Sequence, residues 1–428
     1  MGCLGIAYAG SYLVGTINLG DDPTAYVRKS GEYFTTLVGA DIDGVMLKGS
    51  IHPSVWFWAF TFAANFALVY RGISRGIELF CNVAMPIMAL CAIAVLVRVL
   101  TLPPMTDASG ATRSVLDGLG FMWNPKAAGG HAWYAGLLEA KIWLAAAGQI
   151  FFTLSVGFGV IINYAAYLRK KDDVVLSGLT ASATNEVFEV GFGGLITLTA
   201  AFVFLGTTNM IVAVQGGTFG LGFNTLPVVF AHMGVFGNFI GAVWFFMLFL
   251  AAITSSISMY QPSLAFFQEA LGWSRKHATT LMVAICVGGS FLVMYYSKGG
   301  IFWSTIDDWV GTFLIFVLAM VQIICFSWVF GVKRGIEEAH LGAQLHIPHF
   351  YRFIMKYVTP TYLLVVFVAF CWQNLPSWLK SVADEPLRQG AVGLILAVIV
   401  MLVVMVRVGE RRWRAAGLDL DGTRPPDD

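Results

Sequence analysis

The chain has 428 residues, of which 57% are hydrophobic and only 12% are charged, and its formal net charge is +1. A soluble protein of this length would carry about a quarter charged residues, so the composition excludes an ordinary soluble domain. The balanced charge, without a basic patch, also argues against nucleic acid as a partner.

Apolar stretches of about 20 residues, the length that crosses a bilayer, recur along the chain. They predict ten spans, at 3–19, 51–70, 80–101, 141–168, 176–206, 235–268, 277–297, 306–332, 357–375 and 389–408. No stretch has the composition of a separate soluble domain. We therefore expect an all-α integral membrane protein with one transmembrane domain over residues 1–428 and a tail at 409–428.

Cationic residues gather in short loops on one side of these spans. They are Arg71, Arg75, Arg169 to Lys171, Arg275, Lys276, Lys333, Arg334, Arg411, Arg412 and Arg414. The other side has long loops with few cations, at 20–50, 102–140 and 207–234. The positive-inside rule then predicts a cytoplasmic C-terminus and a first span that runs outward. An outward first span without a cationic lead suggests further sequence upstream.

The span at 141–168 carries polar and small residues at its middle. Thr153 and Ser155 are followed closely by Gly157 and Gly159. Glycines at this depth weaken the helix, and the freed carbonyl groups can bind ions or charged groups. The alternative is close packing of small residues against another helix. With Phe158 in the same turn, a binding site is the preferred interpretation.

Two further spans carry polar groups that suit an ion. Asn185 and Glu189 are four residues apart and share a helix face, and an intramembrane carboxylate is functional unless it pairs structurally. The later stretch AAITSSISMYQP, from Ala251, supplies hydroxyl and carbonyl oxygens one turn apart. Hydroxyls that merely bond to their own helix are the alternative. Asp307 and Asp308 open the span at 306–332, as vestibule carboxylates or as a favourable helix start.

Several motifs in this order resemble the neurotransmitter:sodium symporter family, closest to its bacterial leucine-transporter branch. They are RGISRGIELFCNVAMP, GQIFFTLSVGFG, YLRKKDDVVLSGLTASATNE, TLPVVF, ITSSISMYQP, SRKHA and WVFG. The resemblance implies two inverted repeats of five helices, each opening with a broken helix, followed by two more helices. It makes 1–19 part of the third helix, 141–334 the complete second repeat and 357–408 the last two helices. The first two helices are then not in this sequence.

The resemblance also implies roles for individual residues. Thr153 and Asn185 match the first sodium site, and Ala251, Thr254 and Ser255 match the second. The substrate pocket comprises Phe152, Thr153, Ser155, Phe158, Ser255 and Met259, the last of which replaces an isoleucine of the leucine transporter. Glu189 matches the acid that takes the place of a bound chloride, Asp307 the outer-gate acid and Glu269 the inner-gate acid.

The function implied is sodium-coupled symport of an amino acid or related small amine by alternating access in a bacterial inner membrane. No cofactor besides the coupling ion is expected, chloride is not required, and a homodimer is allowed. The absent first helix would supply about half of each sodium shell, so the chain as written is predicted not to transport. A start codon placed too late, or a degenerate fragment, would explain this.

Other classes of function find less support in the sequence. A non-transporting binding or sensor relative stays open, although the short tail is no signalling domain. An enzyme would need a catalytic constellation, and the chain has neither HExxH nor GxSxG. The six cysteines are scattered without a CxxC motif, so we expect no disulfide framework and no metal other than sodium.

Overall fold

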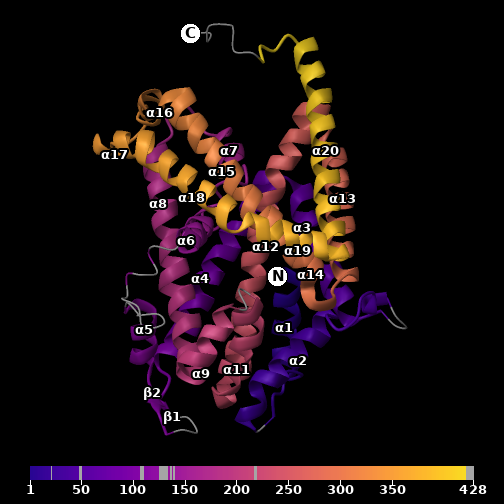
Figure 1. Cartoon of the computed structure of the whole chain (residues 1–428), viewed down its shortest axis with the longest axis vertical. Helices are drawn as coiled ribbons and strands as arrows, with labels where there is room; N and C mark the ends of the chain where they lie inside the picture. Colours follow the sequence, from indigo (N-terminus) through magenta and orange to yellow (C-terminus); the bar gives the residue numbers. More distant parts are fainter. Residues whose placement is uncertain are drawn as a thin grey trace. The chain divides into compact units, whose positions relative to one another are not determined.

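The computed structural model describes residues 1–20, 22–47, 51–106, 110–124, 134, 137, 140–215 and 219–420. Helices occupy each of the ten ranges predicted as spans, and the only strands described are the two-residue β1 (Met105–Thr106) and β2 (Thr112–Arg113), which pair antiparallel. The fold is therefore the all-α one expected (Figure 1).

Seven helical runs in the described part of the chain are long and apolar enough to cross a bilayer. They are Arg75–Leu100, Val174–Gly206, Gly237–Leu271, Arg275–Tyr295, Lys298–Ala339, Phe350–Gln373 and Pro386–Ala415. Four of them contain π-helical segments, which lie before α4 (Leu79–Leu100), between α8 (Val174–Glu186) and α9 (Leu195–Gln215), around α15 (Ile315–Ile324), and before α18 (Thr359–Gln373). The remaining predicted spans are shorter or interrupted: α1 (Gly2–Val14), α3 (Pro53–Arg71), and α6 (Ala140–Thr153) with α7 (Val160–Ala165).

The other helices of these runs have the following bounds. They are η3 (Ile73–Glu78), α4 (Leu79–Leu100), η5 (Val187–Gly194), α12 (Gly237–Leu271), α13 (Arg275–Tyr295), η8 (Lys298–Gly300), α14 (Ile301–Ile306), η9 (Asp307–Leu314), η10 (Cys325–Gly331), α16 (Val332–Ala339), α17 (Phe350–Phe353), η11 (Ile354–Val358), α19 (Leu375–Asp384) and α20 (Pro386–Ala415). The last helix thus includes the start of the stretch predicted as a tail, whose residues 421–428 lie outside the described part.

Two compact units make up the fold, and each combines separate stretches of sequence. The first consists of Met1–Trp133, Ser182–Ile257 and Ser297–Gly299. The second consists of Tyr134–Ala181, Ser258–Tyr296 and Gly300–Asp428. The chain passes from one unit to the other within α8 and within α12.

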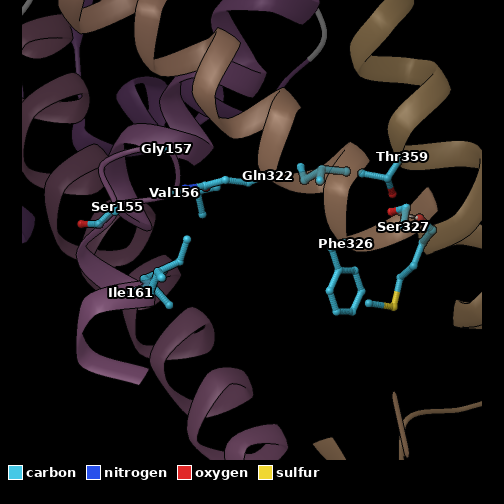
Figure 2. A pocket seen from close by; sticks show the side chains of 12 residues that line it. Ser155, Val156, Gly157, Ile161, Gln322, Phe326, Ser327 and Thr359 are labelled. Carbon is cyan, nitrogen blue, oxygen red and sulfur yellow. Dashed lines mark hydrogen bonds between the residues drawn. The ribbon is translucent and has the colours of Figure 1, made fainter. Parts of the chain in front are cut away.

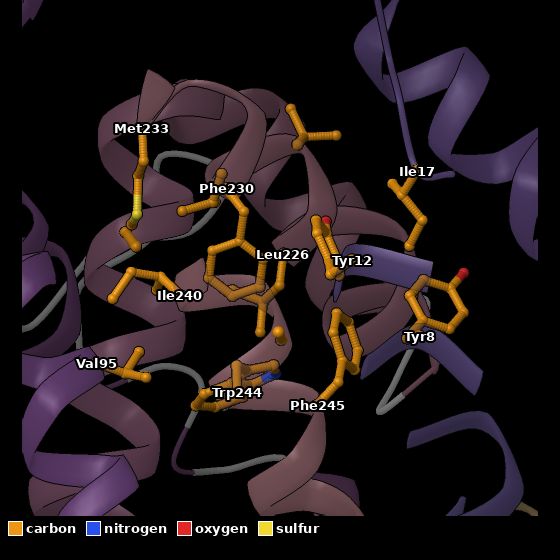
Figure 3. Close-up of a cluster of buried hydrophobic side chains, with 14 of the residues drawn as sticks. Tyr8, Tyr12, Ile17, Val95, Leu226, Phe230, Met233, Ile240, Trp244 and Phe245 are labelled. Carbon is orange, nitrogen blue, oxygen red and sulfur yellow. The ribbon is translucent and has the colours of Figure 1, made fainter. Parts of the chain in front are cut away.

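The core of the first unit is an aromatic cluster around α1 (Figure 3). Tyr8 lies against Phe245 with ring centroids 4.6 Å apart, and Tyr12 stacks on the same ring at 5.8 Å. A Cβ atom at Gly241 would lie 2.9 Å from the Tyr12 ring, so glycine permits this close approach. Because lipid tails are as apolar as these side chains, packing and hydrogen bonds hold such helices together more than the hydrophobic effect does.

The long loops contain short helices, and these helices were not predicted from the sequence. Range 20–50 contains η1 (Pro23–Ala25), the α-helix α2 (Tyr26–Val38) and η2 (Val45–Leu47). Range 207–234 contains the end of α9, η6 (Gly220–Thr225), α11 (Leu226–Ala231) and the start of η7 (Gly234–Phe236). The buried Ser30 of α2 donates a hydrogen bond to the carbonyl of Asn224, 2.6 Å away, so the two loop helices pack together.

Range 102–140 contains α5 (Val115–Trp123), which packs along α9 (Figure 1). The helix begins with a capping box between Ser114 and Asp117. The hydrogen bonds from Ser114 hold the pKa of the Asp117 carboxyl below its usual value. A Cβ atom at Gly118 would lie 2.8 Å from the carbonyl oxygen of Thr199, so a small residue is needed where α5 meets α9.

The core of the second unit joins α6, α15 and α18. Phe151 lies 5.8 Å from Phe316, and Phe316 stacks on Phe367 at 6.3 Å between ring centroids. Ala147 and Ala319 are buried members of the same cluster. This cluster anchors the last turns of α6, directly before the point where the helix is interrupted.

Candidate functional site

The helix predicted to be weakened at its middle is broken there. α6 ends at Thr153 and α7 begins at Val160. Between them Ser155, Gly157 and Gly159 have positive φ angles of 56°, 86° and 75°. A Cβ atom at Gly157 would lie 2.6 Å from the carbonyl oxygen of Ile315, so both its φ and its surroundings require glycine.

Residues predicted to contact the substrate flank this break. The Phe152 and Phe158 rings meet edge to face, with centroids 5.6 Å apart. Thr153 is the last residue of α6 and is partly buried, as is Ser155. Phe152 is 51% exposed within the protein, so its ring is available to a ligand or to a further apolar surface.

The segment after the break packs on the second half of α12. The Tyr164 hydroxyl donates to the Ser258 hydroxyl, 3.3 Å away. A Cβ atom at Gly159 would be in ordinary contact with Pro262, at 3.5 Å. These two contacts bracket the turn of α12 that carries Met259, another predicted substrate residue.

A cavity of about 400 Å³ opens on the side of the break that faces α15 and α18 (Figure 2). Ser155 and Gly157 line it from the break, and Gln322, Phe326 and Thr359 from the opposite wall. Its walls are mainly apolar. Of the predicted substrate residues it includes Ser155 alone, so it is not the predicted pocket as a whole.

Asn185 of α8, predicted to bind sodium, and Glu189 of η5, predicted to take the place of chloride, lie together as their spacing indicates. Asn185 Nδ2 donates to Glu189 Oε2 at 3.4 Å. The helix changes from α to π at Val187, between these two residues. Single π-helical stretches within α-helices are frequent at functional sites.

The predicted second sodium site lies on the first half of α12, within one turn. The Thr254 hydroxyl is within hydrogen-bond distance of the carbonyls of Leu250 (3.1 Å) and Ala251 (3.0 Å), which is the back-bonding considered as the alternative. Its proton is directed to a carbonyl, so its oxygen keeps lone pairs for a cation. Ser255 is exposed on the helix surface.

The two predicted gate acids are both exposed. Asp307 is the first residue of η9, and Glu269 lies near the end of α12, where its main-chain carbonyl accepts from Trp413 Nε1 at 3.2 Å. Neither acid forms an ion pair with another described residue.

The predicted residues divide between the two units. Asn185, Glu189, Ala251, Thr254 and Ser255 belong to the first, and Phe152, Thr153, Ser155, Phe158, Met259, Glu269 and Asp307 to the second.

Sequence reasoning missed Asn65 of α3. This side chain is 5% exposed and bonds to Ser256, next to the predicted second sodium site. An amide within the apolar run FTFAANFALVY was a usable signal.

The chain is similar to known transporters over most of its length. The model of the "Sodium:neurotransmitter symporter family" matches residues 18–414. An uncharacterized sodium-dependent transporter of Methanocaldococcus jannaschii is 26% identical over 366 residues, which make up 84% of this chain and 69% of the relative. A sodium-dependent nutrient amino acid transporter 1 of Drosophila grimshawi is 24% identical over 261 residues, 59% of this chain and 39% of that protein.

Among solved structures, MhsT in complex with L-phenylalanine has a similar fold. The TM-score is 0.67 at 21% sequence identity, and the match covers 86% of this chain and 76% of MhsT. The fold is therefore that of a leucine-transporter-like membrane transporter.

Proposed function

Because this chain belongs to the sodium:neurotransmitter symporter family, whose members are secondary sodium symporters and not enzymes, we propose that it couples sodium entry to the uptake of an apolar or aromatic amino acid. The observation that carries the proposal is the break between Thr153 and Val160. It interrupts the helix at the middle of the range 141–168 predicted as a span, beside two aromatic rings. Such discontinuous helices bind substrate and ions near the bilayer midplane.

The choice of substrate class rests on the side chains at the break. Phe152, Phe158 and Met259 are apolar, and two of them meet edge to face, which suits an apolar or aromatic side chain. A relative named as a nutrient amino acid transporter and a similar fold bound to L-phenylalanine point in the same direction.

The ion sites in this proposal use two sets of oxygen ligands. Thr153 and Asn185 belong to the first site, and Ala251, Thr254 and Ser255 to the second. Glu189 accepts a hydrogen bond from Asn185 and supplies a fixed negative charge near the first site, which would make a bound chloride unnecessary. The membrane potential contributes about 2.3 kcal/mol per charge per 100 mV, and alternating access would convert this energy into uptake.

Uptake of labelled phenylalanine and leucine into proteoliposomes tests the proposal. If the chain transports, contrary to the expectation from the sequence, uptake should require an inward sodium gradient, fail with potassium and persist when gluconate replaces chloride. Thr254→Val should abolish uptake, whereas Thr280→Val, whose hydroxyl bonds to its own helix at Lys276, should not. Sodium-dependent binding without uptake would identify a non-transporting relative. The absence of both binding and uptake would refute the proposal.

A further inference from the structure

We infer that Asn65 of α3 is a positioning residue that fixes the rotation of α12 at the second sodium site. The inference rests on the proposed function, because it assigns Asn65 a role at an ion site that the function requires. It adds a residue from a helix that contributes no proposed ligand. Asn65, Ser256 and the proposed ligands of this site all belong to the first unit.

Hydrogen bonds orient the Asn65 amide from both ends. Its Nδ2 donates to the carbonyl of Thr61 at 2.8 Å, one turn earlier on α3. Its Oδ1 therefore faces α12, where it accepts from the Ser256 hydroxyl. The same hydroxyl lies 3.0 Å from the carbonyl of Ile253, so Ser256 is held between its own helix and α3.

The surroundings make this bond costly to break. Asn65 is 5% exposed and Thr61 is 8% exposed, and both lie on an apolar helix. A Cβ atom at Gly2 of α1 would lie 3.0 Å from the Thr61 methyl carbon and 3.5 Å from Ala252 Cβ, so α1, α3 and α12 approach closely at this level. A buried amide without a partner is unfavourable, so the interface favours the one rotation of α12 that keeps Ser256 on Asn65.

Ser256 directly follows the proposed ligands in sequence. Successive residues of an α-helix project about 100° apart, so fixing the direction of Ser256 also fixes those of Thr254 and Ser255. A helix rotated by a small angle would carry both hydroxyls away from a cation. The bond to Asn65 thus holds the oxygen ligands in place without contacting the ion.

Four single variants and one double variant test the role in proteoliposomes or in detergent. The measurement is the sodium concentration for half-maximal uptake, or for half-maximal thermal stabilisation of the purified protein, at a fixed amino acid concentration. Because one hydrogen bond contributes about 0.5–1.5 kcal/mol, Asn65→Leu should raise this concentration roughly 2- to 13-fold while the maximal rate at saturating sodium is kept. Ser256→Ala, the milder change, should give the same shift, and Ser256→Thr, which keeps the hydroxyl, should behave like the wild type.

The matched control is Thr61→Val on the same helix. The Thr61 hydroxyl donates to Phe57 of its own helix at 2.8 Å, so its loss should leave the sodium dependence unchanged. The double variant Asn65→Leu with Ser256→Ala should show no larger shift than either single variant, because both remove one bond.

The outcomes separate the inference from the proposed function. A sodium-dependent wild type with unshifted Asn65→Leu and Ser256→Ala variants overturns the inference and leaves the function standing. A double variant that regains wild-type sodium dependence also overturns it, because the single variants then suffered from an unpaired buried group. A wild type that does not respond to sodium overturns the proposed function and the inference with it.

Discussion

At the scale of single residues, buried hydroxyl groups of the first unit differ in their partners. The Tyr8 hydroxyl donates to the carbonyl of Phe223 at 3.2 Å, and the ring is fully buried. The Tyr12 hydroxyl is also buried but has no hydrogen-bond partner among the described residues. Both rings contact Phe245, so the two positions form a matched pair.

Tyr8→Phe should therefore destabilise the protein by about 1 kcal/mol, the usual net contribution of one hydrogen bond. Tyr12→Phe should change stability by less than about 0.5 kcal/mol, because no protein bond is lost. Thermal unfolding of the two purified variants in detergent makes the comparison. An equal loss in both variants would show that the hydrogen bond to Phe223 contributes nothing specific.

A second residue-scale prediction concerns Asp173, which precedes α8 outside the spans. Its carboxylate accepts from the amides of Gln344 at 2.7 Å and Leu176 at 2.8 Å. The bond from Gln344, followed by that from Leu176, lowers the pKa of this carboxyl. A group with a lowered folded pKa stabilises the protein above its unfolded pKa of about 3.9, and this stabilisation disappears as the pH falls through the folded value.

The difference in unfolding temperature between the wild type and Asp173→Ala should then be constant above about pH 5 and vanish at lower pH. Asp172→Ala is the control, because the Asp172 carboxylate accepts from Arg169 of its own turn, at 2.8 Å. The control should show a smaller difference. A difference for Asp173→Ala that stays constant down to pH about 2 would contradict the assignment, since the carboxylate would then not be responsible.

Residue contacts were predictable only where they are local in sequence. The bond between Asn185 and Glu189 follows from their spacing of four on a helix. The bond between Asn65 and Ser256 joins residues 191 positions apart, and no pattern in the sequence connects them. The proposed ligand roles stay predictions, since they came from a resemblance and not from a contact.

At the scale of elements, the broken helix depends on two glycines with different surroundings. Both have positive φ, which costs a residue with a side chain roughly 1 kcal/mol. Only Gly157 is also pressed against another helix, at the carbonyl of Ile315, whereas a Cβ atom at Gly159 finds ordinary contact with Pro262.

Gly157→Ala should therefore cost about 2–4 kcal/mol, the sum of the φ penalty and overpacking, and Gly159→Ala about 1 kcal/mol. We expect Gly157→Ala to abolish sodium-dependent uptake and Gly159→Ala to keep part of it. Unfolding temperature and uptake of both variants are the measurements. Equal tolerance of alanine at both positions would mean that the break does not need the close approach to Ile315.

The elements that the sequence predicted are those with a strong local signal. Long apolar runs predicted the spans, and clustered glycines predicted the break between α6 and α7. The helices α2, α5 and α11 were missed because they are short, lie outside apolar runs of span length, and are stabilised by packing on other elements. The π-helical segments likewise have no sequence signature at this level.

At the scale of the whole molecule, the division into two units was not predictable from composition. Each unit gathers stretches that are far apart in the chain, and two of the changes of unit occur inside the helices α8 and α12. A boundary inside a helix has no Pro-, Gly- or Ser-rich signal, because the helix continues through it. Only long-range packing, such as Tyr8 on Phe223 and Phe245, defines the units.

Membrane orientation is the remaining property of the whole molecule, and it depends on charge at the ends of the spans. The end of α20 carries Arg407, Arg411, Arg412 and Arg414 against the single acid Glu410. Glu410 pairs with Arg407 at 3.2 Å and with Arg414 at 3.3 Å, which leaves a net positive helix end. The loop helix α2 lies in a range predicted to face the other side of the membrane.

A fluorescent protein fused to the C-terminus should therefore be fluorescent in a bacterial host, and alkaline phosphatase fused there should be inactive, because the positive-inside rule retains this end in the cytoplasm. Phosphatase fused after Ile42, beyond α2, should be active, since that loop is predicted to be exported. The two reporters control for each other, because the fluorescent protein is active only in the cytoplasm and the phosphatase only on the exported side. An active phosphatase at the C-terminus would invert the orientation, and Asp307 and Glu269 would then exchange their predicted roles at the outer and inner gates.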